Sequence, residues 1–157
     1  MSNTPSKLIH YQRGRFTTHL PEDYLYTPSH AWLSEREDGI WRVGVTKFAT
    51  RMLGEMVDHA FETPPDAAVD CGQIVGWLEG FKAISDLYCV VDGRFLGGNA
   101  ALKDRLSLVD KKPYSDGWLY EAKGTADDRQ ISVRDYMAFL DKAIDKILEK
   151  EQNADIQ

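Results

Sequence analysis

Lys82 is the residue of this chain whose type and position offer the clearest chemistry. It lies between two apolar runs of strand-like composition, Ile74–Leu78 before it and Leu87–Val91 after it. A lysine between two such runs is expected at the tip of a hairpin, where its amine is exposed and accessible. Carboxylates flank it, because Glu79 lies three residues before the lysine and Asp86 four residues after it. The alternative interpretation is an ordinary solvated lysine at a turn.

The sequence lacks the patterns of other reactive sites. Its four histidines are scattered without the spacing of a metal-binding pair, so we expect no metal site. Cys71 and Cys89 lack metal-ligand or redox spacing, and we interpret them as small buried residues rather than a disulfide or an exchanging thiol. No motif pairs a nucleophile with a base, and no glycine-rich phosphate loop is present. The sequence therefore shows no assembled catalytic motif.

The size and charge of the chain restrict its class. It has 157 residues, 43% hydrophobic and 28% charged, which fits one globular domain with a substantial core. Its net charge of −6 argues against a nucleic-acid partner, because phosphate binding needs clustered Lys and Arg. No apolar stretch approaches the roughly 20 residues that span a bilayer, so we expect no membrane partner. The N-terminal region lacks the apolar core of a secretory signal, and we expect a cytoplasmic location.

The elements that must position Lys82 are mostly strands. A short helix is expected over residues 47–53, because Thr46 can cap its start and Gly54 can end it. Asp92-Gly93 is expected to form a turn after the second apolar run. Residues 100–108 read as a loop with a helical turn. Further strands are expected over residues 31–35, 40–45, 55–61, 94–96 and 118–122.

The last part of the chain changes to helical periodicity. Residues 132–135, Ser-Val-Arg-Asp, form a capping box, and apolar residues follow at three- and four-residue steps. The stripe is Val133, Tyr136, Met137, Leu140, Ile144, Ile147 and Leu148. We expect this helix to pack on the sheet and to end near Lys150, with residues 151–157 frayed. The periodicity therefore predicts a mostly β domain with a C-terminal helix.

The neighbourhood of Lys82 resembles the lipoyl-lysine hairpin of the glycine cleavage H-protein family. The family pattern is Glu-Ser-Val-Lys-Ala followed by Ser-Asp or Ser-Glu, with a glycine eleven residues after the lysine. The matching positions are Glu79, Lys82, Ala83, Ser85, Asp86 and Gly93. Gly80 and Phe81 depart from the pattern. Weaker blocks follow in the family's order over about residues 24–124, among them Tyr26-Thr27-Pro28-Ser29-His30-Ala31-Trp32 and Pro113-Tyr114 with Gly117-Trp118.

This resemblance implies a fold, a cofactor and partners. The fold is mainly β, a lipoyl-type barrel-sandwich hybrid with a short internal helix and a C-terminal helix. The implied organisation is an N-terminal arm (residues 1–23), a lipoyl-carrier domain (24–124) and a C-terminal helix and tail (125–157). Lipoate is expected in amide linkage on Lys82, attached by a lipoate ligase or lipoyl-transfer enzymes. Recognition by those enzymes is assigned to Glu79, Ala83, Asp86 and Gly93.

The pathway is inferred from two departures. The family has a glutamate where this chain has Ala31, and commonly a polar residue where it has Phe48, so a cationic aminomethyl cargo would lose a polar partner. The Glu-Gly-Phe-Lys-Ala hairpin also resembles the lipoate-binding proteins of heterodisulfide-reductase-like sulfur oxidation. We therefore expect the arm to carry sulfur intermediates to a heterodisulfide-reductase-like complex. A glycine cleavage H protein working with the glycine cleavage components is the alternative, and a lipoyl relay or an unmodified binding module is a further one.

Overall fold

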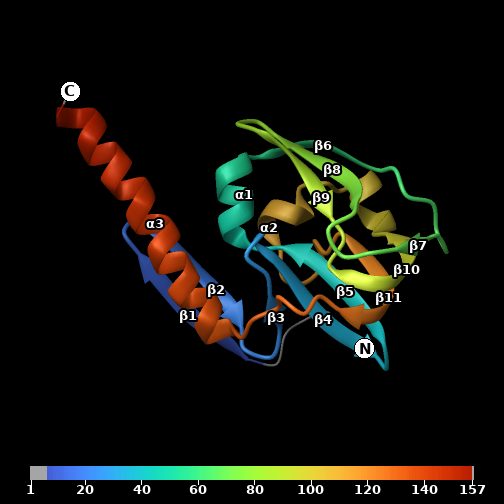
Figure 1. Cartoon of the computed structure of the whole chain (residues 1–157). Helices are drawn as coiled ribbons and strands as arrows, with labels where there is room; N and C mark the ends of the chain where they lie inside the picture. Colours follow the sequence, from blue (N-terminus) through green and yellow to red (C-terminus); the bar gives the residue numbers. More distant parts are fainter. Residues whose placement is uncertain (1–6, 157) are drawn as a thin grey trace.

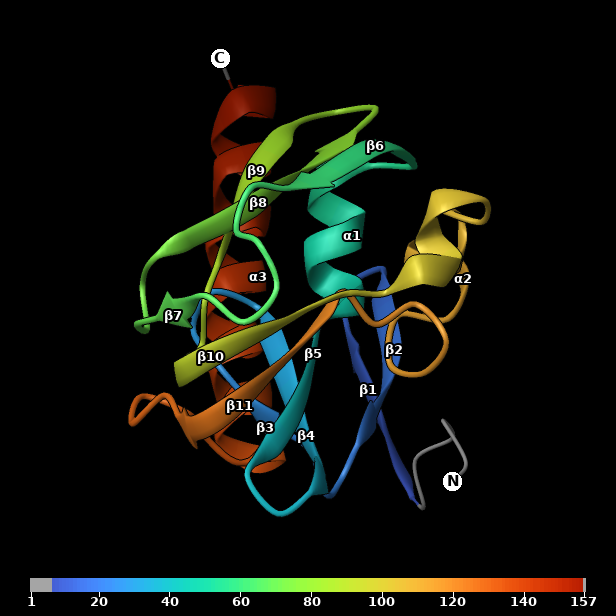
Figure 2. The same cartoon turned by 90° about the vertical axis from the view of Figure 1, so that its right-hand side faces the viewer.

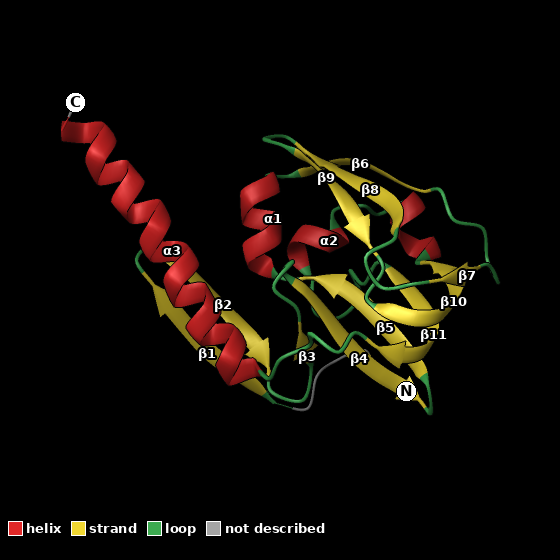
Figure 3. Ribbon diagram, viewed as in Figure 1, coloured by secondary structure: helices red, strands yellow, loops and turns green. Residues whose placement is uncertain are grey.

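The structure is a computed structural model that describes residues 7–156. Most of its elements are short strands (Figure 3). The strands are β1 (Leu8–Arg13), β2 (Phe16–Pro21), β3 (Leu25–Tyr26), β4 (Ala31–Glu37), β5 (Ile40–Val45), β6 (Met56–Phe61), β7 (Ala68–Val69), β8 (Ile74–Gly80), β9 (Ile84–Tyr88), β10 (Val91–Gly98) and β11 (Tyr120–Ala126). The helices are α1 (Lys47–Leu53), a 3-10 turn (Ala100–Lys103), α2 (Leu108–Lys111) and α3 (Val133–Ile156).

Two sheets enclose the main core. One has six strands in the order β3-β4-β5-β11-β10-β7, and the other has three in the order β6-β8-β9. The three-stranded sheet lies over the six-stranded one, with α1 on the side that faces α3 (Figure 1). Leu33, Leu78 and Phe95 are almost fully buried in this core. The expected lipoyl-type barrel-sandwich fold, with its short internal helix and C-terminal helix, is confirmed.

Helix α1 begins and ends where the sequence predicts. The Thr46 hydroxyl accepts a hydrogen bond from the backbone N–H of Ala49 (3.5 Å), as an N-cap residue does. Gly54 ends the helix in a conformation with φ of 84°, which a residue with a side chain rarely adopts. The following strand, β6, can therefore leave the helix end directly beneath the Lys82 hairpin.

A second core joins the two ends of the chain. Strands β1 and β2 form an antiparallel hairpin that packs against α3, behind the larger sheet in Figure 2. The Tyr26 and Tyr136 rings stack with centroids 4.8 Å apart, and the Arg13 guanidinium donates to the Asp145 carboxylate at 2.8 Å. Most of the predicted apolar stripe lies on the buried side of α3, but its last member, Leu148, is 41% exposed. No helix in residues 7–156 combines the length and hydropathy needed to cross a membrane.

Three sequence predictions about element boundaries are wrong. The strand after the lysine covers 84–88 and not 87–91, because the exposed Ile84, Ser85 and Asp86 already pair with β8. Helix α3 continues past Lys150 to residue 156, since no glycine or proline interrupts it. The closing strand β11 begins at Tyr120 rather than 118.

The predicted Asp92-Gly93 turn is also wrong. Both residues lie within β10, where Gly93 pairs with Gly124 of β11 and with Val69 of β7. A Cβ at Gly93 would collide with the carbonyl oxygen of Lys123. The glycine therefore permits two strands to approach closely, which is the other common reason for a glycine in a strand-like run.

Candidate functional site

Lys82 lies at the tip of the β8–β9 hairpin, as predicted, with its side chain exposed. Its backbone N–H donates to the carbonyl oxygen of Leu53 at 2.8 Å, and the N–H of Ala83 donates to the same oxygen at 3.2 Å. On the other side of the lysine, the N–H of Phe81 donates to the carbonyl of Glu55 at 2.8 Å. The tip is therefore fixed to the end of α1 while the lysine side chain remains in solvent. This is a rigid base for a mobile arm.

Two glycines make this docking possible. A Cβ at Gly80 would collide with the carbonyl oxygen of Leu53, and a Cβ at Gly54 would lie 3.0 Å from the backbone nitrogen of Lys82. The departure from the family pattern at Gly80 thus permits a close approach between the hairpin and α1. Phe81, the other departure, is 85% exposed and lies in solvent beside the lysine.

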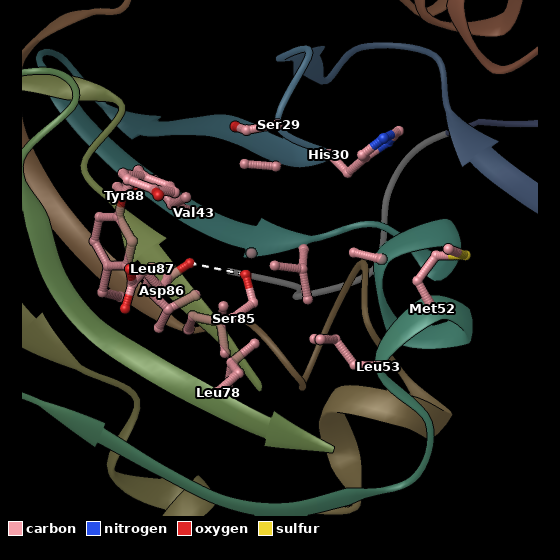
Figure 4. A pocket seen from close by; sticks show the side chains of 16 residues that line it. Ser29, His30, Val43, Met52, Leu53, Leu78, Ser85, Asp86, Leu87 and Tyr88 are labelled. Carbon is pink, nitrogen blue, oxygen red and sulfur yellow. Dashed lines mark hydrogen bonds between the residues drawn. The ribbon is translucent and has the colours of Figure 1, made fainter. Parts of the chain in front are cut away.

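A cavity of about 200 Å³ lies between the hairpin, α1 and strands β4 and β5. We name it the Asp86 cavity; its lining includes Ser29, Ala31, Leu53, Leu78, Ser85 and Asp86 (Figure 4). Asp86 is the one carboxylate among the described lining residues. Leu53, whose carbonyl oxygen holds the hairpin tip, lines the cavity as well. An apolar hollow with a few polar groups therefore opens close to the lysine.

His30 contributes to the wall of the Asp86 cavity in a neutral form. Its Nδ1 lies 2.8 Å from the hydroxyl of Tyr136, and Figure 4 shows its ring directed away from Ser85 and Asp86. Burial lowers the pKa of His30 to about 4. The hydroxyl of Tyr136 also lies 2.8 Å from that of Thr46, the residue that caps α1. Helix α3 is thus tied to both the cavity wall and the start of α1.

The structure separates the two residues on which the pathway prediction depended. Ala31 lines the Asp86 cavity, but Phe48 does not. Phe48 packs on the other side of α1, edge-to-face on Phe16 with ring centroids 5.5 Å apart. Of the two residues, only Ala31 lines the cavity directly, whereas Phe48 contacts its wall through the ring of His30, with centroids 4.6 Å apart. Asp86 still supplies a carboxylate to the cavity.

The predicted recognition residues are only partly brought together. Glu79 pairs with Ile84 at the base of the tip, Ala83 lies on the tip, and Asp86 lies on β9. Gly93 lies in the six-stranded sheet, away from this hairpin. Residues 53–55, Leu-Gly-Glu, dock the hairpin tip, a role for which their local sequence carries no signal. No cluster of three or more His, Cys, Asp or Glu residues suited to a metal ion occurs within the described range 7–156.

Comparison with known proteins gives a consistent result. The family model described as glycine cleavage H-protein matches residues 24–143. The glycine cleavage system H protein of Corynebacterium jeikeium is 36% identical over 126 residues, covering 77% of this chain and 97% of the relative. That of Salmonella arizonae is 35% identical over 124 residues, covering 78% and 94%. A crystal structure of a glycine cleavage system H protein from Mycobacterium marinum superposes with a TM-score of 0.69 at 30% identity, covering 76% and 97%.

Proposed function

We propose, from the premise that this chain belongs to the glycine cleavage H-protein family, that Lys82 carries lipoate and that the loaded arm transports an aminomethyl group between the glycine cleavage components. A family member of this kind is a lipoate-carrying component of a multi-enzyme system and not a catalyst. The observation that carries the proposal is the exposed Lys82 side chain on a backbone fixed to Leu53 and Glu55.

The residues around Lys82 fit a lipoyl group. The amine is accessible to a lipoate ligase or a lipoyl-transfer enzyme, because the tip residues 81–83 are all exposed. The buried Leu53 and Leu78 supply apolar wall to the Asp86 cavity, as the apolar end of the arm requires. When bound, the group supplies thiol–disulfide chemistry, and the protein supplies position and shielding.

The charge of the Asp86 cavity suits a cationic cargo. A carboxylate beside an ammonium group forms a charge-assisted hydrogen bond, which is stronger in a partly enclosed site than in open water. Asp86 offers that carboxylate, while Ser29 and Ser85 offer hydroxyl groups to the same cavity. The family glutamate that Ala31 replaces is therefore not the only acidic group available for this role.

Delivery of sulfur intermediates to a heterodisulfide-reductase-like complex finds no support in these comparisons. The relatives named above are all glycine cleavage system H proteins. Phe48, on which that prediction relied, does not line the Asp86 cavity and reaches its wall only through contact with His30. Glycine cleavage, the alternative in the sequence analysis, is the function that the chain supports best.

The test reconstitutes glycine cleavage from the lipoylated protein and the other components of the system. We expect glycine-dependent turnover, and we expect Asp86→Asn to lower it by on the order of tenfold, the scale of one charge-assisted hydrogen bond. Asp66→Asn, an exposed carboxylate outside the cavity, is the matched control. The assignment would be contradicted if the fully lipoylated protein showed no turnover while its Ala31→Glu variant did.

A further inference from the structure

A second hollow, of about 710 Å³, lies on the other side of α1 from the Asp86 cavity. Its walls are the turn between β1 and β2, one side of α1 and the last turns of α3, and Lys82 is among its lining residues. We name it the α3 groove. In Figure 1 the tip of the Lys82 hairpin lies above α1, on the side that faces α3. Met52 lines both hollows, so it lies on the boundary between them.

The floor of the α3 groove is apolar. Phe16, Phe48 and Ile144 are buried there, each with less than a tenth of its surface exposed. Met52 and Leu148 also line the groove and are 50% and 41% exposed. Half-exposed apolar side chains over a buried aromatic floor favour contact with an apolar chain of matching length.

The rim of the α3 groove is basic, although the chain as a whole carries a net charge of −6. Arg15 and Arg51 are exposed and form no salt bridge with any residue in the described part of the chain. Arg13 is different, because its guanidinium pairs with the carboxylates of Asp141 and Asp145 at 3.4 and 2.8 Å, which together outweigh its single charge. Glu151 is the one acidic residue among the described lining residues.

Two of the three walls of the α3 groove come from parts of the chain that the family model does not match, and the third is α1. That match covers residues 24–143, whereas the groove uses residues 13–16 from the β1–β2 turn and 144–151 from α3. The Asp86 cavity lies wholly inside the matched range. The α3 groove is therefore an addition to the shared domain, placed against its reactive lysine.

We propose that the α3 groove is a second resting site for the arm on Lys82, and that it receives the arm when the group on the arm's sulfur is an anion. The inference rests on the proposed lipoylation of Lys82. Acylation removes the lysine's own charge, so Arg15 and Arg51 then dominate the rim. An anionic group is repelled by Asp86 on one side of Met52 and attracted by the two arginines on the other. The charge of the cargo thus selects the side of α1 on which the arm rests.

The experiment compares two arms that differ in charge and hardly in shape. Lipoylated protein is reduced with a phosphine and alkylated with iodoacetate or with iodoacetamide. In each reaction a thiolate sulfur bonds to the methylene carbon, iodide leaves, and the thiol proton goes to the buffer. The products carry anionic carboxymethyl groups or neutral carboxamidomethyl groups. Lys82→Arg, treated identically, reports any reaction at Cys71 or Cys89, whose thiol pKa values are raised by burial.

Methyl NMR signals report where each arm rests. We expect the anionic arm to shift the signals of Ile144 and Leu148 and the neutral arm to shift them less. In an Arg15→Gln/Arg51→Gln double variant, the population in the groove should fall about fivefold, the scale of exposed charge pairs. Arg94→Gln, an exposed arginine on β10, is the control and should keep the parent behaviour.

Two results would overturn the inference, and they differ in what they imply. In the first, mass analysis shows the lipoyl adduct, and both arms shift only the methyl signals of Leu78 and Leu87 in the Asp86 cavity. The α3 groove is then not a resting site, and the proposed function stands. If no adduct forms on Lys82, the proposed function and this inference fail together.

Discussion

At the scale of single residues, the site depends on a fixed backbone and a free side chain at Lys82. Three backbone N–H groups of residues 81–83 donate to the carbonyl oxygens of Leu53 and Glu55. Each such bond contributes about 1 kcal/mol, so the tip is held while the lysine side chain stays free. Asp86 and Ala83 lie close enough to this tip to take part in recognition or in holding cargo, whereas Gly93 serves the packing of another sheet.

Glu79 is predicted to serve recognition by the modifying enzyme more than stability. It is a partly exposed carboxylate on a surface strand, where an ionic contact is worth under about 1 kcal/mol. Glu79→Ala should slow lipoylation, followed by intact mass over time, and should barely change the melting temperature. Glu62→Ala, an exposed residue outside the hairpin, is the control. Unfolding of the Glu79 variant with an unchanged modification rate would refute the assignment.

His30 is predicted to make the protein acid-sensitive. Burial lowers its pKa from 6.5 to about 4, so the unfolded chain binds a proton more readily than the folded one. The contribution of neutral His30 to the free energy of unfolding is therefore fully present above pH 6.5 and is lost as the pH falls toward 4. The loss reaches about 3 kcal/mol, at about 1.4 kcal/mol for each pKa unit.

Denaturant melts between pH 7 and pH 4 test this prediction. His30→Gln should be less stable at pH 7 and should show a flatter decline across the window, because glutamine does not titrate. His10→Gln, an exposed histidine, should keep the parent slope. A parent slope retained in the His30 variant would show that other groups cause the acid loss.

At the scale of elements, local sequence signals identified most helices and strands. They failed where contacts with distant residues determine whether a segment is a strand or a turn. Helix α1 was predictable because Thr46 and Gly54 act within their own turns. The start of β9, the strand after Lys82, was not predictable, because Ile84, Ser85 and Asp86 are exposed and lack the apolar alternation of a strand. The Asp-Gly at 92–93 has the composition of a turn, and only the distant partner Gly124 reveals its role in a strand pair. The α3 groove escaped prediction for the same reason, since its walls come from residues far apart in the sequence.

Helix α3 is predicted to stabilise the molecule through its buried stripe. Leu140 is fully buried in the second core, and Leu140→Ala should lower the free energy of unfolding by about 2–5 kcal/mol. Leu148, on the same helix, is 41% exposed, so Leu148→Ala should cost much less. Urea melts of both variants give the comparison. Equal stability of the Leu140 variant and the parent would show that α3 contributes little and acts mainly in partner binding.

At the scale of the whole molecule, the chain is a family domain with further elements on both sides of the matched range. The matched range, 24–143, holds the lysine hairpin and the Asp86 cavity. The β1–β2 hairpin and the part of α3 after residue 143 lie outside that range, and the ion pair between Arg13 and Asp145 joins them. Tyr11 and Arg13 also contact Asp141, which lies inside the range. The matched domain holds the acidic hollow on one side of α1, and the enlargement helps to build the basic one on the other side. Both hollows lie beside the hairpin from which the proposed arm extends.

The most direct measurement is therefore the mass of the protein after co-expression with a lipoate ligase, followed by peptide mapping. We expect one lipoyl adduct, mapped to Lys82, absent from Lys82→Arg and retained in the control Lys123→Arg. An adduct that persists in Lys82→Arg, or a parent protein that stays unmodified beside a known H protein lipoylated by the same enzyme, would contradict this expectation.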